Sequence, residues 1–368
     1  MISAFTCLAC GRPDVPNLQA HVRLQLGDNQ DASNNYTFGD VRGLTFGKDN
    51  QILVVDSRTG SLSGFDFTDG HLQFRIDSIG ISGFSKSGLC CVAVDKEGTL
   101  WAREFNTRSY IAFKVDGSAL TPRTNIQGGR NPYGAPVRVS WDSGGKIFDY
   151  VTSVPDFHKP AILISSLIDS TGRIARSDTV PTFPAESLTD YFFIDHSRSD
   201  SVTATYKMPF GSTGLWAVGP NGQVATALTS RYDVQWMKVG GEDVEHVYQT
   251  PPKVKLSRGE RDRAEQMLKS IARRIKLSRA QLDFIVPNEK PPLVALGFDL
   301  DGRLWVERST RDGSPHVADI YQRGGSKIAT AEWPRDIDLN LWAVRGTSAL
   351  GVKRNKSGSK IVVIELKS

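Results

Sequence analysis

The sequence is poor in the residues and patterns that mark a catalytic or metal centre. Its six histidines are scattered, and none forms an H-x-x-x-H pair. Cys90 and Cys91 are adjacent, which disfavours a relaxed disulfide. Cys7 and Cys10 have metal-ligand spacing, but no second pair or nearby histidine completes a site. A G-x-x-x-x-G-K-S phosphate loop is also absent, so no motif of established chemistry emerges.

Long apolar runs are absent too, and no segment approaches the roughly 18 apolar residues that indicate a membrane-spanning helix. The net charge of +5 is concentrated, because residues 253–279 hold ten Lys or Arg and three Asp or Glu. The rest of the chain is close to neutral. A nucleic-acid-binding protein is expected to spread a basic stripe over its main fold. We therefore expect no nucleic-acid partner.

What the sequence does contain is a repeated strand pattern. Most copies begin with a Gly- or Asn-containing turn, followed by Leu or Ile, a large side chain and another strand former. The six copies lie at 49–56, 96–104, 143–151, 212–219, 300–308 and 338–346, with Ile52, Leu100, Ile147, Leu215, Leu304 and Leu341 at the shared position. A second apolar run precedes most copies. Each therefore predicts a β-hairpin whose tight turn needs Gly, Asp or Asn.

A further hairpin follows the first copies, which gives four-stranded units that must stack to bury both faces. Radial stacking predicts an all-β fold, a six-bladed β-propeller over residues 19–368. The last unit has only three strands after residue 337, and the alternating segment 19–27 can supply the fourth. Strands from the N- and C-terminal regions would then close the ring and remove exposed sheet edges.

The first blade resembles an NHL repeat, whose rhythm is V-x-D-x-x-N-x-R-I-x-V-F-D. In "LVVDSRTGSLSGFDFTDG", Asp56, Leu62, Phe65 and Asp66 occupy the Asp, Ile, Phe and Asp positions of that rhythm. The chain is thus similar to six-bladed propellers of the NHL and TolB-like group, found among bacterial exported lipoproteins. Members of such groups range from binding scaffolds to lactonases and lyases, so the resemblance implies a fold rather than a reaction. For Asp56 and Glu104 we favour a turn role, as carboxylates that accept backbone N–H bonds.

The β rhythm is interrupted by an insertion at about residues 253–290, between the fourth and fifth blades. Ser257 and Glu260 form an S-x-x-E capping box, which predicts the start of a helix. Apolar residues then recur at helical spacing, at Ala264, Met267, Leu268, Ile271 and Ile275. The opposite face is basic, so the helix at 257–277 can sit on an anionic membrane surface. The alternative packs its apolar face on the propeller, as a lid over the central opening in one version.

Four cations stand at or near the predicted starts of innermost strands: Arg42, Arg138, Lys207 and Arg335. In a closed propeller these positions approach the central channel, where like charges raise a positive potential. They are our candidate ligand-binding residues, for an anionic ligand or an acidic peptide. The alternative is that each cation pairs with an Asp or Glu of a neighbouring blade.

Residues 1–18 are interpreted as a truncated lipoprotein signal and linker. "CLACGRPDVP" resembles the end of a bacterial lipoprotein signal, in which Cys10 would be the lipidated residue. The preceding "MISAFT" is too short for the apolar region of such a signal, so this interpretation requires a start codon further upstream. It predicts a protein anchored to the bacterial cell envelope, periplasmic or on the outer surface. The alternative is a cytoplasmic protein.

The leading functional expectation is a non-catalytic module without a cofactor, which presents loops and the insertion to a protein, a peptide or a glycan. The alternative is a metal-dependent enzyme of the lactonase or lyase kind, with a divalent cation such as calcium in the channel. Its candidate ligands are Asp40, Glu104, Asn131, Asp195 and Asp336. A triad-like trio, Asp195, His196 and Ser197, is consecutive, and neighbours in a strand point apart, so we assign no catalytic residue.

Overall fold

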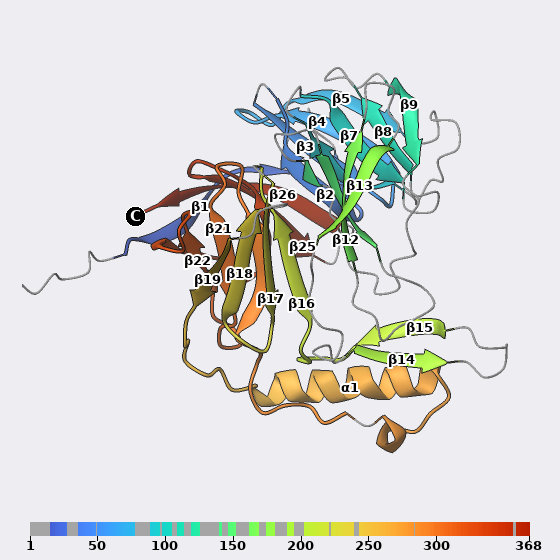
Figure 1. The fold of residues 1–368 in the computed structure, drawn as a ribbon, viewed down its shortest axis with the longest axis vertical. Coiled ribbons are helices and arrows are strands. Elements are labelled where there is room, and N and C mark those ends of the chain that lie inside the picture. The colour runs from blue at the N-terminus through green and yellow to red at the C-terminus, as the bar shows by residue number, and fades with distance from the viewer. Residues whose placement is uncertain are drawn as a thin grey trace, which may run out of the picture.

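Antiparallel β-sheet makes up most of the described chain (Figure 1). The structure is a computed structural model, and it describes residues 15–27, 36–48, 50–77, 89–95, 98–104, 109–113, 119–125, 140–141, 146–151, 162–168, 174–180, 190–194, 202–220, 222–238, 243–282, 284–355 and 358–368. Within these ranges, no helix is both long and apolar enough to cross a membrane.

The strands of these ranges form six four-stranded units, numbered here as blades 1 to 6. Blade 1 contains β2 (Val41–Phe46), β3 (Gln51–Asp56), β4 (Ser61–Asp66) and β5 (Leu72–Asp77). Blade 2 contains β6 (Leu89–Val94), β7 (Leu100–Glu104), β8 (Ser109–Phe113) and β9 (Ala119–Asn125). Blade 3 contains β10 (Ser140–Trp141), β11 (Lys146–Val151), β12 (Ile162–Ile168) and β13 (Ile174–Val180).

The second half of the chain supplies the other three blades. Blade 4 contains β16 (Gly214–Val218), β17 (Gln223–Leu228), β18 (Asp233–Lys238) and β19 (Val244–Tyr248). Blade 5 contains β20 (Leu293–Phe298), β21 (Leu304–Arg308), β22 (His316–Tyr321) and β23 (Lys327–Trp333). Blade 6 contains β24 (Ile337–Arg345), β25 (Ser348–Asn355), β26 (Gly358–Lys367) and β1 (Asn17–Leu26).

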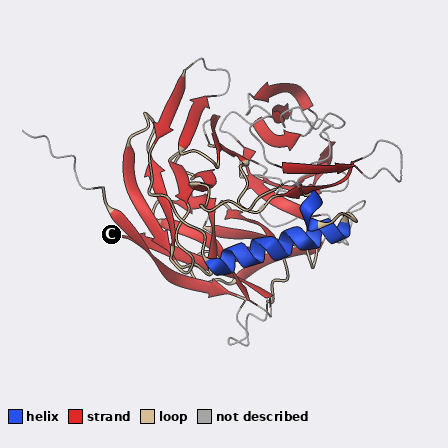
Figure 2. Cartoon of the chain, turned by 90° about the horizontal axis from the view of Figure 1, so that it is seen from below, coloured by secondary structure: helices blue, strands red, loops and turns tan. Residues whose placement is uncertain are grey.

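The first strand of each blade lies on the inside of the ring. β2 contacts both β6 and β24, β6 contacts β10, and β20 contacts both β16 and β24. Figure 2 shows the sheets following one another around a common centre, with the helix crossing one side of the face toward the viewer. The prediction of an all-β propeller with a helical insertion is confirmed.

The closing strand is also where the sequence predicts it. β1 pairs antiparallel with β26, from Gln19 opposite Lys367 to Leu26 opposite Ile361. A short parallel pairing of β1 with β23 then joins the sheets of blades 5 and 6. Residues near the two ends of the chain therefore share one blade.

In blade 5 the repeat reads Leu304-Trp305, and hydrogen bonds within the preceding turn hold the tryptophan in place. The Asp299 carboxylate accepts hydrogen bonds from the backbone N–H of Arg303 at 2.8 Å and from Trp305 Nε1 at 2.8 Å. Between them, Gly302 has a φ of 80°, which a residue with a side chain rarely adopts. In blade 5 the turn is thus tied to the aromatic ring of the following strand.

Blade 2 repeats this arrangement. Asp95 accepts the backbone N–H of Thr99 at 2.8 Å and Trp101 Nε1 at 2.9 Å, and Gly98 has a φ of 84°. In both blades, an aspartate six residues before the tryptophan accepts its indole N–H.

One blade differs from the sequence-based assignment. The run at 205–210, with Lys207 near its start, is expected to be an innermost strand preceding the copy at 212–219. Instead, Lys207 ends β15 (Val202–Lys207), which pairs only with β14 (Asp190–Ile194) within the described chain. The copy itself, with Leu215, is the first strand of blade 4, because β16 pairs with β17 directly.

The helical insertion forms a small core of its own. α1 (Arg258–Arg274) begins at Ser257, where both bonds of the predicted capping box are present, and η3 (Arg279–Gln281) follows it. Leu268 and Ile271 are buried against Met208 and the segment after the helix, whereas Met267 is 47% exposed. The helix lies below the ends of β16 and β17 in Figure 1, beside the β14–β15 hairpin.

We predict that Trp305→Phe lowers the free energy of unfolding by about 1–3 kcal/mol, because the fully buried Asp299 loses a hydrogen-bond donor. Chemical denaturation measures this change. Trp236→Phe is the matched control, since Trp236 is also buried and packs on Phe298 at 5.2 Å between ring centroids. Equal losses in the two variants would show that ring volume, and not the hydrogen bond, matters at Trp305.

Candidate functional site

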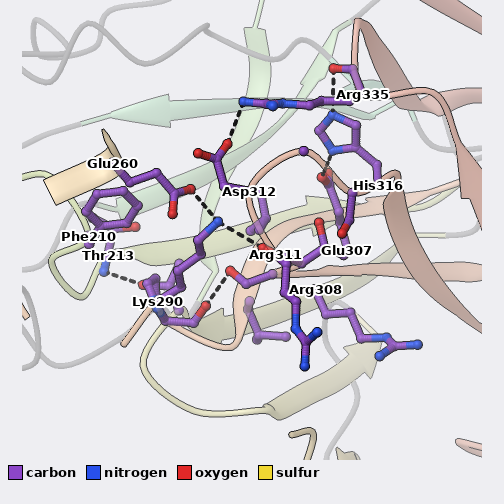
Figure 3. A pocket seen from close by; sticks show the side chains of 18 of the residues that line it. Phe210, Thr213, Glu260, Lys290, Glu307, Arg308, Arg311, Asp312, His316 and Arg335 are labelled. Atoms are coloured by element: carbon purple, nitrogen blue, oxygen red, sulfur yellow. Dashed lines mark hydrogen bonds and ion pairs between the residues drawn. The ribbon is translucent and has the colours of Figure 1, made fainter. Parts of the chain in front are cut away.

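A cavity of about 330 Å³ opens where β20 begins and β21 ends, between blade 5 and the insertion (Figure 3). Three neighbouring blades and the helix contribute to its wall. Its polar lining includes Thr213 and Thr229 of blade 4, Glu260 and Lys290 of the insertion, the segment 307–314 and His316 of blade 5, and Arg335 just before blade 6. This volume is at the lower end of the range typical of small-molecule pockets.

A histidine and a glutamate face each other in this wall. His316 Nδ1 lies 2.8 Å from Glu307 Oε1. The two residues come from adjacent strands, because Glu307 of β21 is opposite Ala318 of β22, two positions from His316. The imidazole ring also stacks on Trp333, with 5.4 Å between ring centroids and 7° between planes. Strand register therefore brings together two residues that are nine positions apart in sequence.

The surroundings of His316 favour its protonated form. The hydrogen bond with Glu307 raises the pKa of His316, and burial of the ring only partly opposes this effect. The other ring nitrogen, Nε2, lies 3.2 Å from the carbonyl oxygen of Arg335. Both ring nitrogens thus face hydrogen-bond acceptors. Only an imidazolium carries an N–H on each nitrogen and can donate to both.

Ion pairs from the insertion form another part of the wall. Lys290 pairs with Glu260 and donates a hydrogen bond to the carbonyl oxygen of Thr310 at 2.8 Å. Burial pushes the pKa of Glu260 upward, but the hydrogen bond and charge of Lys290 and the hydrogen bonds of Ser257 together outweigh burial and lower the pKa. Asp312 accepts from Ser257 Oγ at 2.9 Å and pairs with Arg335 at 2.7 Å. The start of α1 is therefore fixed to the loop of blade 5.

Of the four cations predicted from the sequence, only Arg42 and Arg335 have described side chains. Arg335 lines the cavity, while Arg42 is exposed in blade 1 and pairs with Asp40 at 2.8 Å. Arg42 occupies a β-bulge between Val41 and Gly43, which re-aims its side chain. Lys207 lies on β15, outside the six blades. Arg138 lies outside the described residues, as does Cys10.

The two proposed metal ligands with described side chains, Asp336 and Asp40, are engaged in other contacts. Asp336 pairs with Lys353 at 2.6 Å, and Asp40 accepts from Ser57 Oγ at 2.7 Å as well as pairing with Arg42. In the described part of the chain, no three His, Cys, Asp or Glu residues gather in a way that could hold a metal ion. We therefore derive no step through a metal.

The remaining carboxylates of the sequence analysis are accounted for where they are described. Asp56 accepts the backbone N–H groups of Gly39, Asp40 and Arg58 at 2.8 to 3.0 Å, which confirms its turn role. Only the backbone of Glu104 is described, and positions 131 and 195, the other two metal candidates, lie outside the described residues.

No family model matches the sequence. No curated protein is similar to it in sequence. Solved structures of similar architecture include virginiamycin B lyase from Staphylococcus aureus, at 11% identity and a TM-score of 0.47, covering 95% of this chain and 100% of that one. Regucalcin from Agrobacterium tumefaciens, a calcium-binding protein, shows 10% identity, 96% and 97% coverage and a TM-score of 0.45. A gluconolactonase from Xanthomonas campestris shows 11% identity, 90% and 87% coverage and a TM-score of 0.45.

The leading expectation from the sequence is a non-catalytic binding module, whereas the solved structures of similar architecture include a lyase and a gluconolactonase. At these identities the likeness concerns the fold alone. The sequence also missed the pair of Glu307 and His316, which the strand register brings together.

We predict that His316 stabilises the fold most at low pH. Its raised pKa means that folding favours the protonated form, so this stabilisation is complete below the unfolded-state pKa of about 6.5 and is lost as pH rises through the folded-state pKa. The difference in unfolding free energy between the wild type and His316→Gln should shrink from about pH 5 to about pH 9. A pH-independent difference would contradict the assignment of an imidazolium.

Proposed function

We propose that the chain is an enzyme of the lactonase or lyase kind, in which His316 gives a proton to a small ligand bound in the cavity. The single observation that carries this proposal is the His316–Glu307 pair in the wall of a cavity of ligand size. A proton donor with a pKa raised by a carboxylate is the form that general acid catalysis needs near neutral pH.

The geometry supports a defined route for the proton. Nε2–H is the donor with the weaker contact, at 3.2 Å from the Arg335 carbonyl, so an oxygen of a bound ligand can replace that partner. In ester or lactone hydrolysis, water attacks the carbonyl carbon, the C–O bond breaks, and the leaving oxygen takes the Nε2 proton. The neutral imidazole keeps Nδ1–H on Glu307 and recovers the proton released by the attacking water. Atoms and charge therefore balance without another reactant.

A panel of simple γ- and δ-lactones and phenyl acetate tests this proposal by pH-stat titration. We expect hydrolysis of at least one member by the wild type, with a rate that falls as pH rises and His316 loses its proton. His316→Gln should lower kcat by about 10²–10⁴-fold. Glu307→Gln should move the falling limb to lower pH, because the pKa of His316 is no longer raised.

His246→Gln is the control for these variants. His246 also pairs with a carboxylate, Asp233 at 3.1 Å, but it is exposed and lies outside the cavity lining. Its activity should equal that of the wild type. Hydrolysis that is unaffected by His316→Gln would remove the proposal, as would a wild type that hydrolyses no member of the panel.

We also propose, from sequence resemblance alone, that the protein is acylated on Cys10 and anchored in a bacterial envelope, as NHL-like exported lipoproteins are. Mass spectrometry of the native N-terminus checks this prediction. We expect a diacylglyceryl-modified cysteine as the first residue of the mature chain. An unmodified Met1 in the mature cellular protein would contradict it.

A further inference from the structure

The charges of the cavity wall are unevenly matched. Each of its three carboxylates already faces a cation or the imidazolium: Glu260 faces Lys290, Asp312 faces Arg335, and Glu307 faces His316. Its cations are more numerous. Arg308 and Arg311 also line the cavity, and no carboxylate of the lining is paired with either of them.

Arg311 is a cation without a partner. Among the described residues, no side chain pairs with its guanidinium, although Asp312 is its neighbour in sequence. Asp312 is engaged by Arg335 and Ser257 instead. In Figure 3 the side chains of Arg308 and Arg311 extend toward the lower edge of the view, away from Asp312 and Arg335. One positive charge in the wall is therefore left uncompensated.

Arg308 is held in place from behind. Its Nε lies 3.5 Å from Oδ2 of Asp319, a carboxylate that is only 2% exposed. Asp319 is itself fixed by the Tyr232 hydroxyl, which donates at 2.9 Å, and by Lys327 at 2.6 Å. No described residue hydrogen-bonds to the terminal nitrogens of Arg308. The ion pair with Asp319 therefore leaves the terminal nitrogens of Arg308 able to bind an anion.

The hydroxyl group of Thr213 is a third hydrogen-bond donor of the wall. The hydroxyl of Thr213 is buried and has no hydrogen-bond partner among the described residues. Buried hydroxyl groups are usually paired, so an unpaired one in a cavity wall indicates a missing acceptor. The cavity thus offers spare donors from blades 4 and 5, while its acceptors are engaged.

We propose that the cavity binds a small organic monoanion through its carboxylate, which the guanidinium groups of Arg311 and Arg308 hold. A guanidinium fork matches the two oxygens of a carboxylate. Binding of the carboxylate does not depend on the proposed reaction. The inference rests on the proposed function only where it takes this carboxylate to belong to the substrate.

Isothermal titration with hexanoate, hexanamide and inorganic phosphate tests the proposal on the full chain. We expect hexanoate to bind more tightly than the uncharged amide and more tightly than phosphate. Arg311→Gln should weaken hexanoate binding by about 10-fold or more. Arg323→Gln removes the same charge from the exposed turn between β22 and β23 and should leave binding unchanged. Arg311→Lys keeps the charge without the fork, and we expect an intermediate affinity from it even if the Gln variant fails to fold.

Equal binding of hexanoate and hexanamide would overturn the proposal, and so would tighter binding of phosphate or full affinity in both Arg311 variants. The two proposals fail separately. Hexanoate binding that depends on Arg311, without hydrolysis of any lactone, would remove the proposed reaction and leave the carboxylate site. Hydrolysis that needs His316, without preference for the carboxylate, would do the reverse.

Discussion

Pairing between β1 and β26 is the contact on which the rest of the structure depends. It joins residues near the two ends of the chain, so one blade is complete only when both are in place. The loop that this pairing closes is long, but the entropic cost of closing a loop grows slowly with its length. In return β26 has no unpaired edge. The cavity lies where blades 5 and 6 meet. Glu307 belongs to blade 5, and the carbonyl group of Arg335 comes just before blade 6.

Features of the fold that depend on local chemistry could be read from the sequence. The capping box at Ser257 and Glu260 predicts the helix because both of its hydrogen bonds form within one turn. The alternating segment 19–27 predicts a strand in the same way. The run ending at Lys207 has the same apolar pattern as a blade strand, yet it forms a separate hairpin. Which strands pair is decided by contacts between distant residues, and a pattern of apolar residues does not contain them.

The site was less predictable than the fold. Arg335 was found because it precedes an innermost strand, a position that the repeat defines. Glu307 and His316 were missed because their contact depends on the register of β21 against β22, and a shift of one residue would turn either side chain to the other face. At Arg42, a bulge turns the side chain away from the direction that strict alternation assigns to it.

The protonated His316 is also a structural link between two blades. Its two N–H groups contact Glu307 of blade 5 and the Arg335 carbonyl before blade 6. A neutral imidazole has one N–H, so after the ring gives up a proton only one of these contacts remains a hydrogen bond. Glu307 is a charged acceptor and forms the shorter contact, and it therefore keeps the remaining proton. Loss of the proton weakens the contact with Arg335, whose side chain holds Asp312 at the rim of the cavity. In the proposed reaction, this ring connects proton transfer to a ligand with the shape of the cavity.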